Sequence, residues 1–161
     1  MPLKKSFLAS RAKHSQNKLN LPLLNSLSEK QIEQFLLSRN NLIPVTIFSK
    51  KLSCFEALCR YLHENKQISI RQIATKLGKS YRNIWLTYSH ANTKLSTPIV
   101  PKHTEFYIPL STIAKQDSVL TAVTVFLKER HHLSFKQIGQ LLGRSNKTLW
   151  TVYNRARRSS R

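Results

Sequence analysis

The feature that most constrains the fold of this chain is an internal repeat. A shift of 65 residues, without a gap, aligns residues 43–91 with residues 108–156. Identical residues then fall into register along the whole alignment: Ile43/Ile108, Pro44/Pro109, Lys50/Lys115, Ala57/Ala122, Leu62/Leu127, Glu64/Glu129, Ser69/Ser134, Gln72/Gln137, Ile73/Ile138, Leu77/Leu142, Gly78/Gly143, Ser80/Ser145, Trp85/Trp150, Tyr88/Tyr153 and Ala91/Ala156. Unrelated segments of this length share few positions, so the sequence predicts two copies of one small unit.

Each copy has the pattern of three helices. In the first copy, Ser53 and Glu56 have the spacing of a capping box, before a helix that ends near Asn65. The same signature opens a second helix in both copies, at Ser69/Gln72 and Ser134/Gln137. Apolar residues at helical spacing predict the buried faces: Phe55, Leu58, Cys59, Leu62, Ile73 and Leu77, and in the second copy Leu120, Val123, Thr124, Leu127, Ile138 and Leu142.

A short turn links the second helix of each copy to a third. Gly78 and Gly143 stand where a helix ends in a left-handed residue, which glycine adopts without a Cβ clash. Two residues later, Ser80 and Ser145 are suited to cap the third helix. The buried positions of that helix are Ile84, Tyr88 and Ala91, or Leu149, Tyr153 and Ala156. A turn this short forces a sharp crossing, so each copy is predicted to contain a helix-turn-helix.

The repeat divides the chain into five segments. We expect a flexible basic arm (1–20), an N-terminal helix (21–42), a first helix-turn-helix unit (43–92), a linker containing prolines (93–105) and a second unit with a basic tail (106–161).

The fold class follows from these segments. We predict an all-α fold of two tandem three-helix helix-turn-helix units related by internal duplication, preceded by an N-terminal helix. The β-branched segments Ile43–Phe48 and Tyr107–Ile113 are expected to form extended arms or short strands before each unit, and they can pair with each other.

The charge of the chain points to a polyanionic partner. Twenty-seven Lys and Arg against seven Asp and Glu give a formal net charge of +20. The acids are absent between Glu64 and Glu105, after Glu129, and from the first twenty residues. A compact domain with such segregated charge repels itself unless an anionic partner offsets it. Nucleic acid is the first candidate and an anionic membrane surface the second.

The second copy, with its sequence GRSNKTLWTVYNRARR, resembles the promoter-reading C-terminal helix-turn-helix of bacterial sigma factors. The resemblance covers about 25 residues per copy and follows the pattern S-x-x-E/Q-I-A-x-x-L-G-x-S-x-x-T-V with a basic tail. Matching residues in the second copy are Ser134, Gln137, Ile138, Leu142, Gly143, Ser145, Thr148, Leu149, Arg155, Ala156 and Arg157. In the first copy they are Ser69, Gln72, Ile73, Ala74, Leu77, Gly78, Ser80, Ile84, His90 and Ala91. Gly139 replaces the usual Ala, and Trp85 and Trp150 replace a usual polar residue. No segment resembles the sigma regions that bind core polymerase or melt promoters.

The start of the third helix is the expected reading surface. In helix-turn-helix proteins the N-terminal residues of the recognition helix reach base edges in the major groove. The candidates are Tyr81, Arg82, Asn83 and Leu86, and in the second unit Asn146, Lys147, Thr148 and Thr151. Arg82 or Lys147 can bind guanine O6 and N7, and Asn83 or Asn146 can bind adenine N6 and N7.

Other residues are expected to contact the backbone or to pack. Helix caps and basic side chains are candidate phosphate ligands: Ser69, Arg71, Lys79, Ser80, Ser134, Lys136, Arg144, Ser145, Arg155, Arg157 and Arg158. Trp85 and Trp150 either pack against an arm or the other unit, or make an apolar contact to DNA.

Together these features predict a double-stranded DNA-binding protein with two different recognition helices, either a transcription regulator or a nucleoid-associated factor. One chain suffices for two half-sites, although a dimer is compatible, and RNA polymerase is a further candidate partner. The alternatives are an RNA-binding protein, or a DNA-recognition or adaptor subunit of a polymerase, recombination or packaging machine. A cytoplasmic, chromosome-associated location is expected, because no signal peptide or membrane span is evident and Cys54 and Cys59 are suited to a reduced core.

An enzyme is not expected. The seven acids form no evident pair, the six His lack zinc spacing, and three Gly are too few for a phosphate-binding loop. Neither a cofactor nor a metal ion is therefore predicted.

Overall fold

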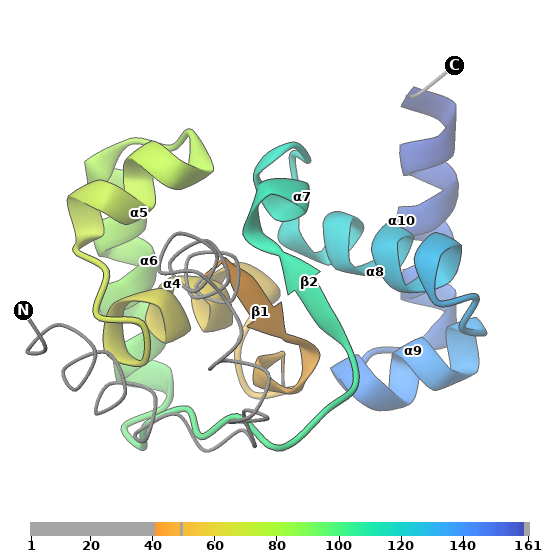
Figure 1. Ribbon diagram of the computed structural model, residues 1–161, viewed down its shortest axis with the longest axis horizontal. Coiled ribbons are helices and arrows are strands. Elements are labelled where there is room, and N and C mark those ends of the chain that lie inside the picture. The colour runs from red at the N-terminus through yellow and green to blue at the C-terminus, as the bar shows by residue number, and fades with distance from the viewer. Residues whose placement is uncertain (1–40, 49, 160–161) are drawn as a thin grey trace, which may run out of the picture. The chain divides into compact units, whose positions relative to one another are not determined.

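The computed structural model describes residues 41–48 and 50–159, which form a mostly helical fold with one small sheet (Figure 1). The elements in chain order are β1 (Leu42–Pro44), the 3₁₀ helix η1 (Val45–Ile47), α4 (Cys54–Glu64), α5 (Ile70–Leu77), α6 (Tyr81–Lys94), β2 (Tyr107–Pro109), α7 (Leu110–Ala114), α8 (Val119–Arg130), α9 (Phe135–Leu142) and α10 (Asn146–Ser159). The predominantly helical class is thus confirmed. The expected basic arm (1–20) lies outside the described residues, as does nearly all of the expected N-terminal helix (21–42). Leu42, its last residue, belongs to β1 instead.

The elements of residues 42–94, called the first half, recur 65 residues later in residues 107–159, called the second half. The bounds of α5 and α9 correspond residue for residue, and so do those of α6 and α10. The correspondence extends to backbone detail. Gln67 and His132, counterparts in the two halves, are the non-glycine residues with positive φ in the described part of the chain, at 55° and 53°.

The two halves meet in the sheet. β1 and β2 pair antiparallel, with Ile43 opposite Ile108, and this confirms the expected pairing of the arms. Hydrogen bonds from Val45 N to Phe106 O (3.0 Å) and from Leu110 N to Asn41 O (2.7 Å) extend the ladder symmetrically. An antiparallel pair that places a residue opposite its own counterpart has a local two-fold axis between the strands. The arms are extended only in the strands, since η1 and α7 follow at once.

The predicted helix boundaries are confirmed where side chains cap them. Capping boxes are present at Ser53/Glu56, Ser69/Gln72 and Ser134/Gln137. Ser80 Oγ accepts a hydrogen bond from Asn83 N, and Ser145 Oγ accepts one from Thr148 N. Gly78 and Gly143 have φ values of 60° and 61°, the left-handed conformation that a short turn between two helices requires.

One continuous core serves both halves. Ile43 and Ile108 are fully buried in it, and so are the predicted core positions Leu58, Ile73 and Ile138. α4 packs against α8, and the second helix of each half reaches across, α5 to α7 and α9 to η1. These reciprocal contacts are those of a two-fold pair, so the halves form a single packed body.

Residues 95–106, called the connector, lie against the first half. The expected linker began at residue 93, but α6 continues to Lys94 because Arg60 and Glu56 hold its end. Arg60 Nη1 donates to Leu95 O, Asn65 Nδ2 donates to Ile99 O at 3.0 Å, and the side chain of Ile99 is buried. The connector is therefore a docked segment rather than a free spacer.

Candidate nucleic-acid interface

Each half presents the start of its third helix to solvent. In the first half, the left-handed Gly78 ends α5 and the Ser80 cap starts α6 two residues later. Ile84 is buried beneath that start and anchors it to the core. All of the predicted reading residues are exposed: Tyr81, Arg82, Asn83 and Leu86 on α6, and Asn146, Lys147, Thr148 and Thr151 on α10. The geometry of the turn therefore leaves these side chains available to a partner.

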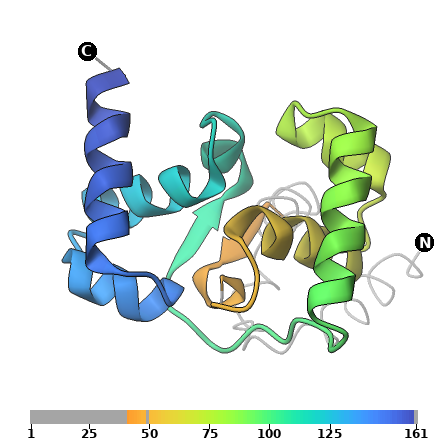
Figure 2. The same cartoon turned by 180° about the vertical axis from the view of Figure 1, so that it is seen from behind.

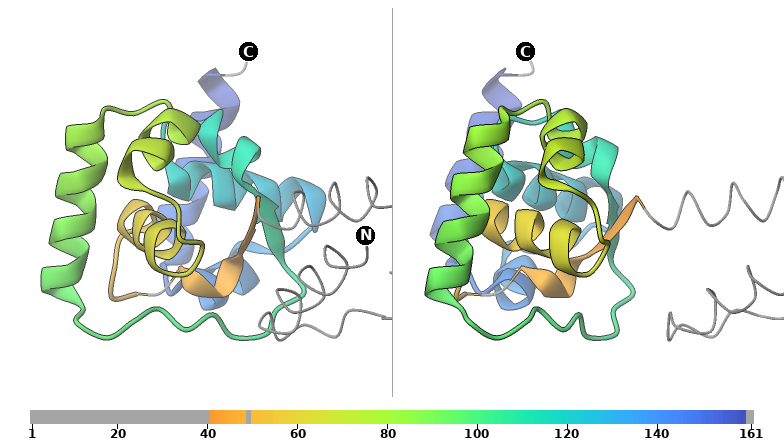
Figure 3. Two further views of the ribbon diagram at one scale, coloured as in Figure 1. Left: turned by 60° about the vertical axis from the view of Figure 1, so that its left-hand side comes forward. Right: turned by 90° about the vertical axis from the view of Figure 1, so that its left-hand side faces the viewer.

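α6 and α10 lie on the same side of this part of the molecule. Figure 2 shows both helices in front, one at each end, running in opposite directions. The right-hand view of Figure 3 shows them along one edge, opposite to the side on which β1 begins. This is the arrangement that the two-fold axis between the strands imposes.

The tryptophans belong to the same exposed surface. The side chains of Trp85 and Trp150 are 49% and 57% exposed, so neither is part of the core between the halves. Helical spacing places Trp85 one turn after Arg82 on α6, and the next residue, Leu86, is also exposed. Sequence reasoning assigned these indoles to packing or DNA contact, and their exposure leaves them free for the second role.

The reading residues are not equivalent in geometry. Asn83 and Thr148 already have side-chain hydrogen-bond partners. Thr87 Oγ1 donates to Asn83 Oδ1 at 3.4 Å, and the hydroxyl oxygens of Thr148 and Ser145 are 2.8 Å apart. Asn154, one turn beyond Trp150, was not among the predicted interface residues. The spacing i, i+3, i+7 nevertheless places it on the same face of α10 as Lys147 and Trp150. It lines a shallow hollow together with Trp150, Arg157 and Arg158.

Most of the candidate phosphate ligands are exposed. Those with free surface are Ser69, Arg71, Lys79, Ser80, Ser134, Lys136, Ser145, Arg155, Arg157 and Arg158. The four serine hydroxyls also cap helices, so their side chains hold the turn geometry. The basic residues provide the charge.

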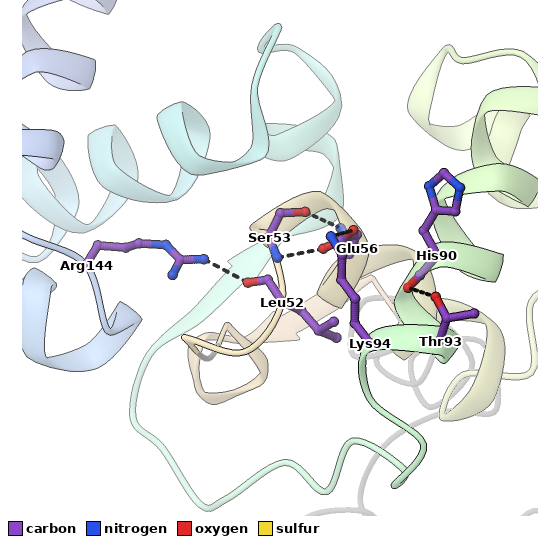
Figure 4. A network of polar contacts seen from close by, with 7 residues as sticks. All are labelled: Leu52, Ser53, Glu56, His90, Thr93, Lys94 and Arg144. Atoms are coloured by element: carbon purple, nitrogen blue, oxygen red, sulfur yellow. Dashed lines mark hydrogen bonds and ion pairs between the residues drawn. The ribbon is translucent and has the colours of Figure 1, made fainter.

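Arg144 is placed differently from the expectation. Its side chain turns toward the first half and Nη2 donates to Leu52 O at 2.7 Å (Figure 4). Burial raises the pKa of the Cys54 thiol, and the Arg144 guanidinium lowers it in part. The Arg144 guanidinium therefore contacts the other half, and its expected role as a phosphate ligand stays a prediction. Its counterpart, Lys79, is exposed.

The basic charge of the third helices is asymmetric. α10 ends in the exposed Arg155, Arg157 and Arg158, whereas α6 has His90, Asn92 and Thr93 at the corresponding positions. Lys94 at the end of α6 is paired with Glu56 (Figure 4). Burial alone would raise the pKa of Glu56, but hydrogen bonds from Lys94 and Ser53 outweigh it and lower the pKa from its usual 4.5.

Two kinds of feature are absent from the described residues. No three His, Cys, Asp or Glu side chains gather there as a metal site would require. None of the helices between residues 41 and 159 combines the length and apolar character needed to cross a membrane.

Comparison of the chain with protein-family models, with curated proteins and with solved structures gives no match. The functional argument therefore depends on the residues and their arrangement.

Proposed function

We propose that the two halves are duplicated helix-turn-helix units and that the protein binds double-stranded DNA through α6 and α10. One observation carries this proposal: two helix starts with exposed polar and basic residues project from one side of a single packed body. An α-helix fits the major groove, and a duplex presents successive major grooves to one side. The net charge of +20 supplies the sequence-independent attraction to phosphate.

The exposed residues support distinct roles. Arg82 and Lys147, at the N-terminal turns, would read guanine, and Asn146 would read adenine. Asn83, which bonds to Thr87, would read a base only by exchanging that contact. The apolar faces of the exposed indoles fit thymine methyl groups or sugars. Phosphate contacts would come from the basic residues that remain exposed: Arg71, Lys79, Lys136, Arg155, Arg157 and Arg158.

Two differing reading surfaces favour site selection, and hence a transcription regulator, over uniform coating by a nucleoid-associated protein. Such a protein would be cytoplasmic and chromosome-associated, and RNA polymerase would be a further partner. The proposal involves no catalysis and no cofactor.

Fluorescence anisotropy of a labelled duplex tests the proposal. With six exposed basic phosphate ligands, log K should fall with log[salt] at a slope of about −5 between about 50 and 200 mM salt. Competition with single-stranded RNA of the same sequence should leave the duplex bound. A flat salt response, or displacement by the RNA, would contradict duplex binding.

The double variant Arg82→Ala with Lys147→Ala tests the reading surface. It should lose preference between duplex sequences while keeping most of its non-specific affinity. The charge-conserving exchange Arg82→Lys with Lys147→Arg is the matched control and should retain a sequence preference, because either residue can read guanine. A sequence preference that survives the alanine variant would mean that the reading surface lies elsewhere.

A second function is favoured by the exposure of Trp85 and Trp150. Exposed aromatic side chains are typical of protein interfaces and of platforms for single-stranded nucleic acid. An adaptor or RNA-binding protein would lose its protein or single-stranded RNA partner when both tryptophans become alanine, with no change in its affinity for duplex DNA. A DNA reader would lose duplex affinity in the same variant.

A further inference from the structure

The arrangement of the two halves constrains the order of bases in the DNA site. We propose that one chain reads two non-identical half-sites in inverted orientation, at a fixed spacing, and so binds its site in one direction only. This inference rests on the proposed duplex binding and specifies the class of duplex that is bound.

The inverted orientation follows from the sheet. Ile43 lies opposite Ile108, and the flanking pairs Leu42 with Pro109 and Pro44 with Tyr107 run antiparallel. The axis that this register defines also exchanges α6 with α10, which run in opposite directions on one side of the body (Figure 2). A duplex has two-fold axes perpendicular to its length, so a two-fold pair of helices meets inverted half-sites. Direct repeats would require two units related by translation, which this strand pairing does not allow.

The non-identity of the half-sites follows from the exposed residues. The first half presents Tyr81-Arg82-Asn83 and Leu86, where the second presents Asn146-Lys147-Thr148 and Thr151. Arg82 and Lys147 can both read guanine, but the candidate adenine reader follows Arg82 in the first half (Asn83) and precedes Lys147 in the second (Asn146), so the two corners do not share one base preference. The arginine-rich end of α10 adds phosphate contacts on one side only. The bound chain is therefore oriented.

The fixed spacing follows from the contacts between the halves. They share one core, α4 packs on α8, and Arg144 reaches Leu52 from the other half. The connector is held by Arg60 and Asn65. With no free linker between them, the two reading helices cannot adjust to half-sites set further apart. Adjacent major grooves on one side of a duplex are about 10–10.5 base pairs apart.

Selection from a random duplex library with the intact chain tests this inference. The expected product is two blocks of preferred bases, different from each other, read on opposite strands and separated by one constant distance. Reversing one block within the duplex, or inserting about 5 base pairs between the blocks, should lower affinity at least tenfold. Enrichment of direct repeats, or of blocks at variable distances, would overturn the inference while leaving duplex binding intact. Failure to enrich any duplex would overturn duplex binding itself.

A converted chain makes the test sharper. Tyr81→Asn, Arg82→Lys, Asn83→Thr and Leu86→Thr give the first reading helix the corner of the second, and all four positions are exposed. The site selected by this variant should be a palindrome of the block that requires Lys147 in the parent chain. The reverse conversion is the matched control: Asn146→Tyr, Lys147→Arg, Thr148→Asn and Thr151→Leu should give a palindrome of the other block. Circular dichroism spectra that match the parent show that both variants fold. A converted variant that selects a direct repeat, or the unchanged parent site, would overturn the inverted arrangement.

Discussion

The two halves share the same order of elements but differ in the polar contacts that stabilise each of them. In the first half, Arg60 is buried and pairs with Glu64 at 2.8 Å, and Lys94 pairs with Glu56. Their counterparts in the second half are Val125, Glu129, Ser159 and Thr121. α4 begins with a capping box, whereas Ser118 makes no side-chain cap for α8. The first half thus relies on polar contacts that the second half lacks.

The difference extends to the ends of the third helices, α6 and α10. The polar contacts of the first half hold the end of α6 and the connector. Lys94, the basic residue at the end of α6, is therefore paired with Glu56 within the chain. In the second half the end of α10 keeps its arginines exposed. Under the proposed function, the end of α10 would be available to an anionic partner, whereas the end of α6 is held by contacts within the chain.

The largest expected effect comes from removing this charge difference. The variant replaces the exposed arginines at the end of α10 by alanine, and the matched control replaces their first-half counterparts: Arg155, Arg157 and Arg158 against His90, Asn92 and Thr93. Each lost phosphate contact lowers affinity about eightfold near 0.1 M salt and the salt slope by about 0.9. The triple arginine variant should therefore bind duplex DNA several hundred-fold more weakly, measured by anisotropy. The control should change less than about threefold, and equal losses would contradict the asymmetry.

A smaller effect is expected for the contact that joins the halves. Arg144→Ala removes a charged donor from Leu52 O and should lower the free energy of unfolding by about 2 kcal/mol. The exposed counterpart change, Lys79→Ala, should cost about 0.5 kcal/mol or less. Urea unfolding measures both. A reduced salt slope of DNA binding with unchanged stability in Arg144→Ala would mean that Arg144 is a phosphate ligand after all.

The two turn glycines sharpen the comparison further. Alanine at Gly78 or Gly143 must adopt a left-handed conformation, at about 1 kcal/mol. A Cβ at Gly143 would also lie 3.1 Å from Lys50 Cβ in the other half. A Cβ at Gly78 would have no such neighbouring atom within 4 Å. Gly143→Ala should therefore destabilise the chain by about twice as much as Gly78→Ala in urea unfolding. Equal losses would show that the contact with Lys50 yields without cost.

The smallest effect concerns pH. The pKa of Glu56 is lower in the folded chain than its usual 4.5, so its contribution to stability is present above that pH. As the pH falls through the folded-state pKa, Glu56 is protonated and the contribution is lost. The difference in unfolding free energy between the parent and Glu56→Gln should therefore shrink on acidification below pH 4.5. A difference that stays constant down to pH 3 would contradict this role.

The sequence predicted those features that depend on near neighbours. The capping boxes at Ser53, Ser69 and Ser134, and the left-handed glycines, involve residues within a few positions of one another. The exposure of the reading residues followed from helical periodicity, because Ile84 and Leu149 define the buried side. Local spacing is sufficient for such features.

What the sequence did not predict depends on contacts between distant residues. Arg144 reaches Leu52, 92 residues earlier, and its local pattern matched that of the exposed Lys79. The docking of the connector depends on Arg60 and Asn65, whose partners Leu95 and Ile99 lie 35 and 34 residues later in the sequence. No local pattern marks such contacts. The residues of η1 and α7, which follow the two strands, were expected to be extended because β-branched side chains favour strands. They are helical instead, and they pack against α9 and α5 respectively.

The strand pair also bears on how such a chain can arise. A register with Ile43 opposite its own counterpart is the one in which two separate half-length polypeptides would close as a symmetric homodimer. In a homodimer every substitution occurs twice, so both arms must change together. In a single chain with this two-fold geometry, counterpart positions such as Arg82 and Lys147 can change independently.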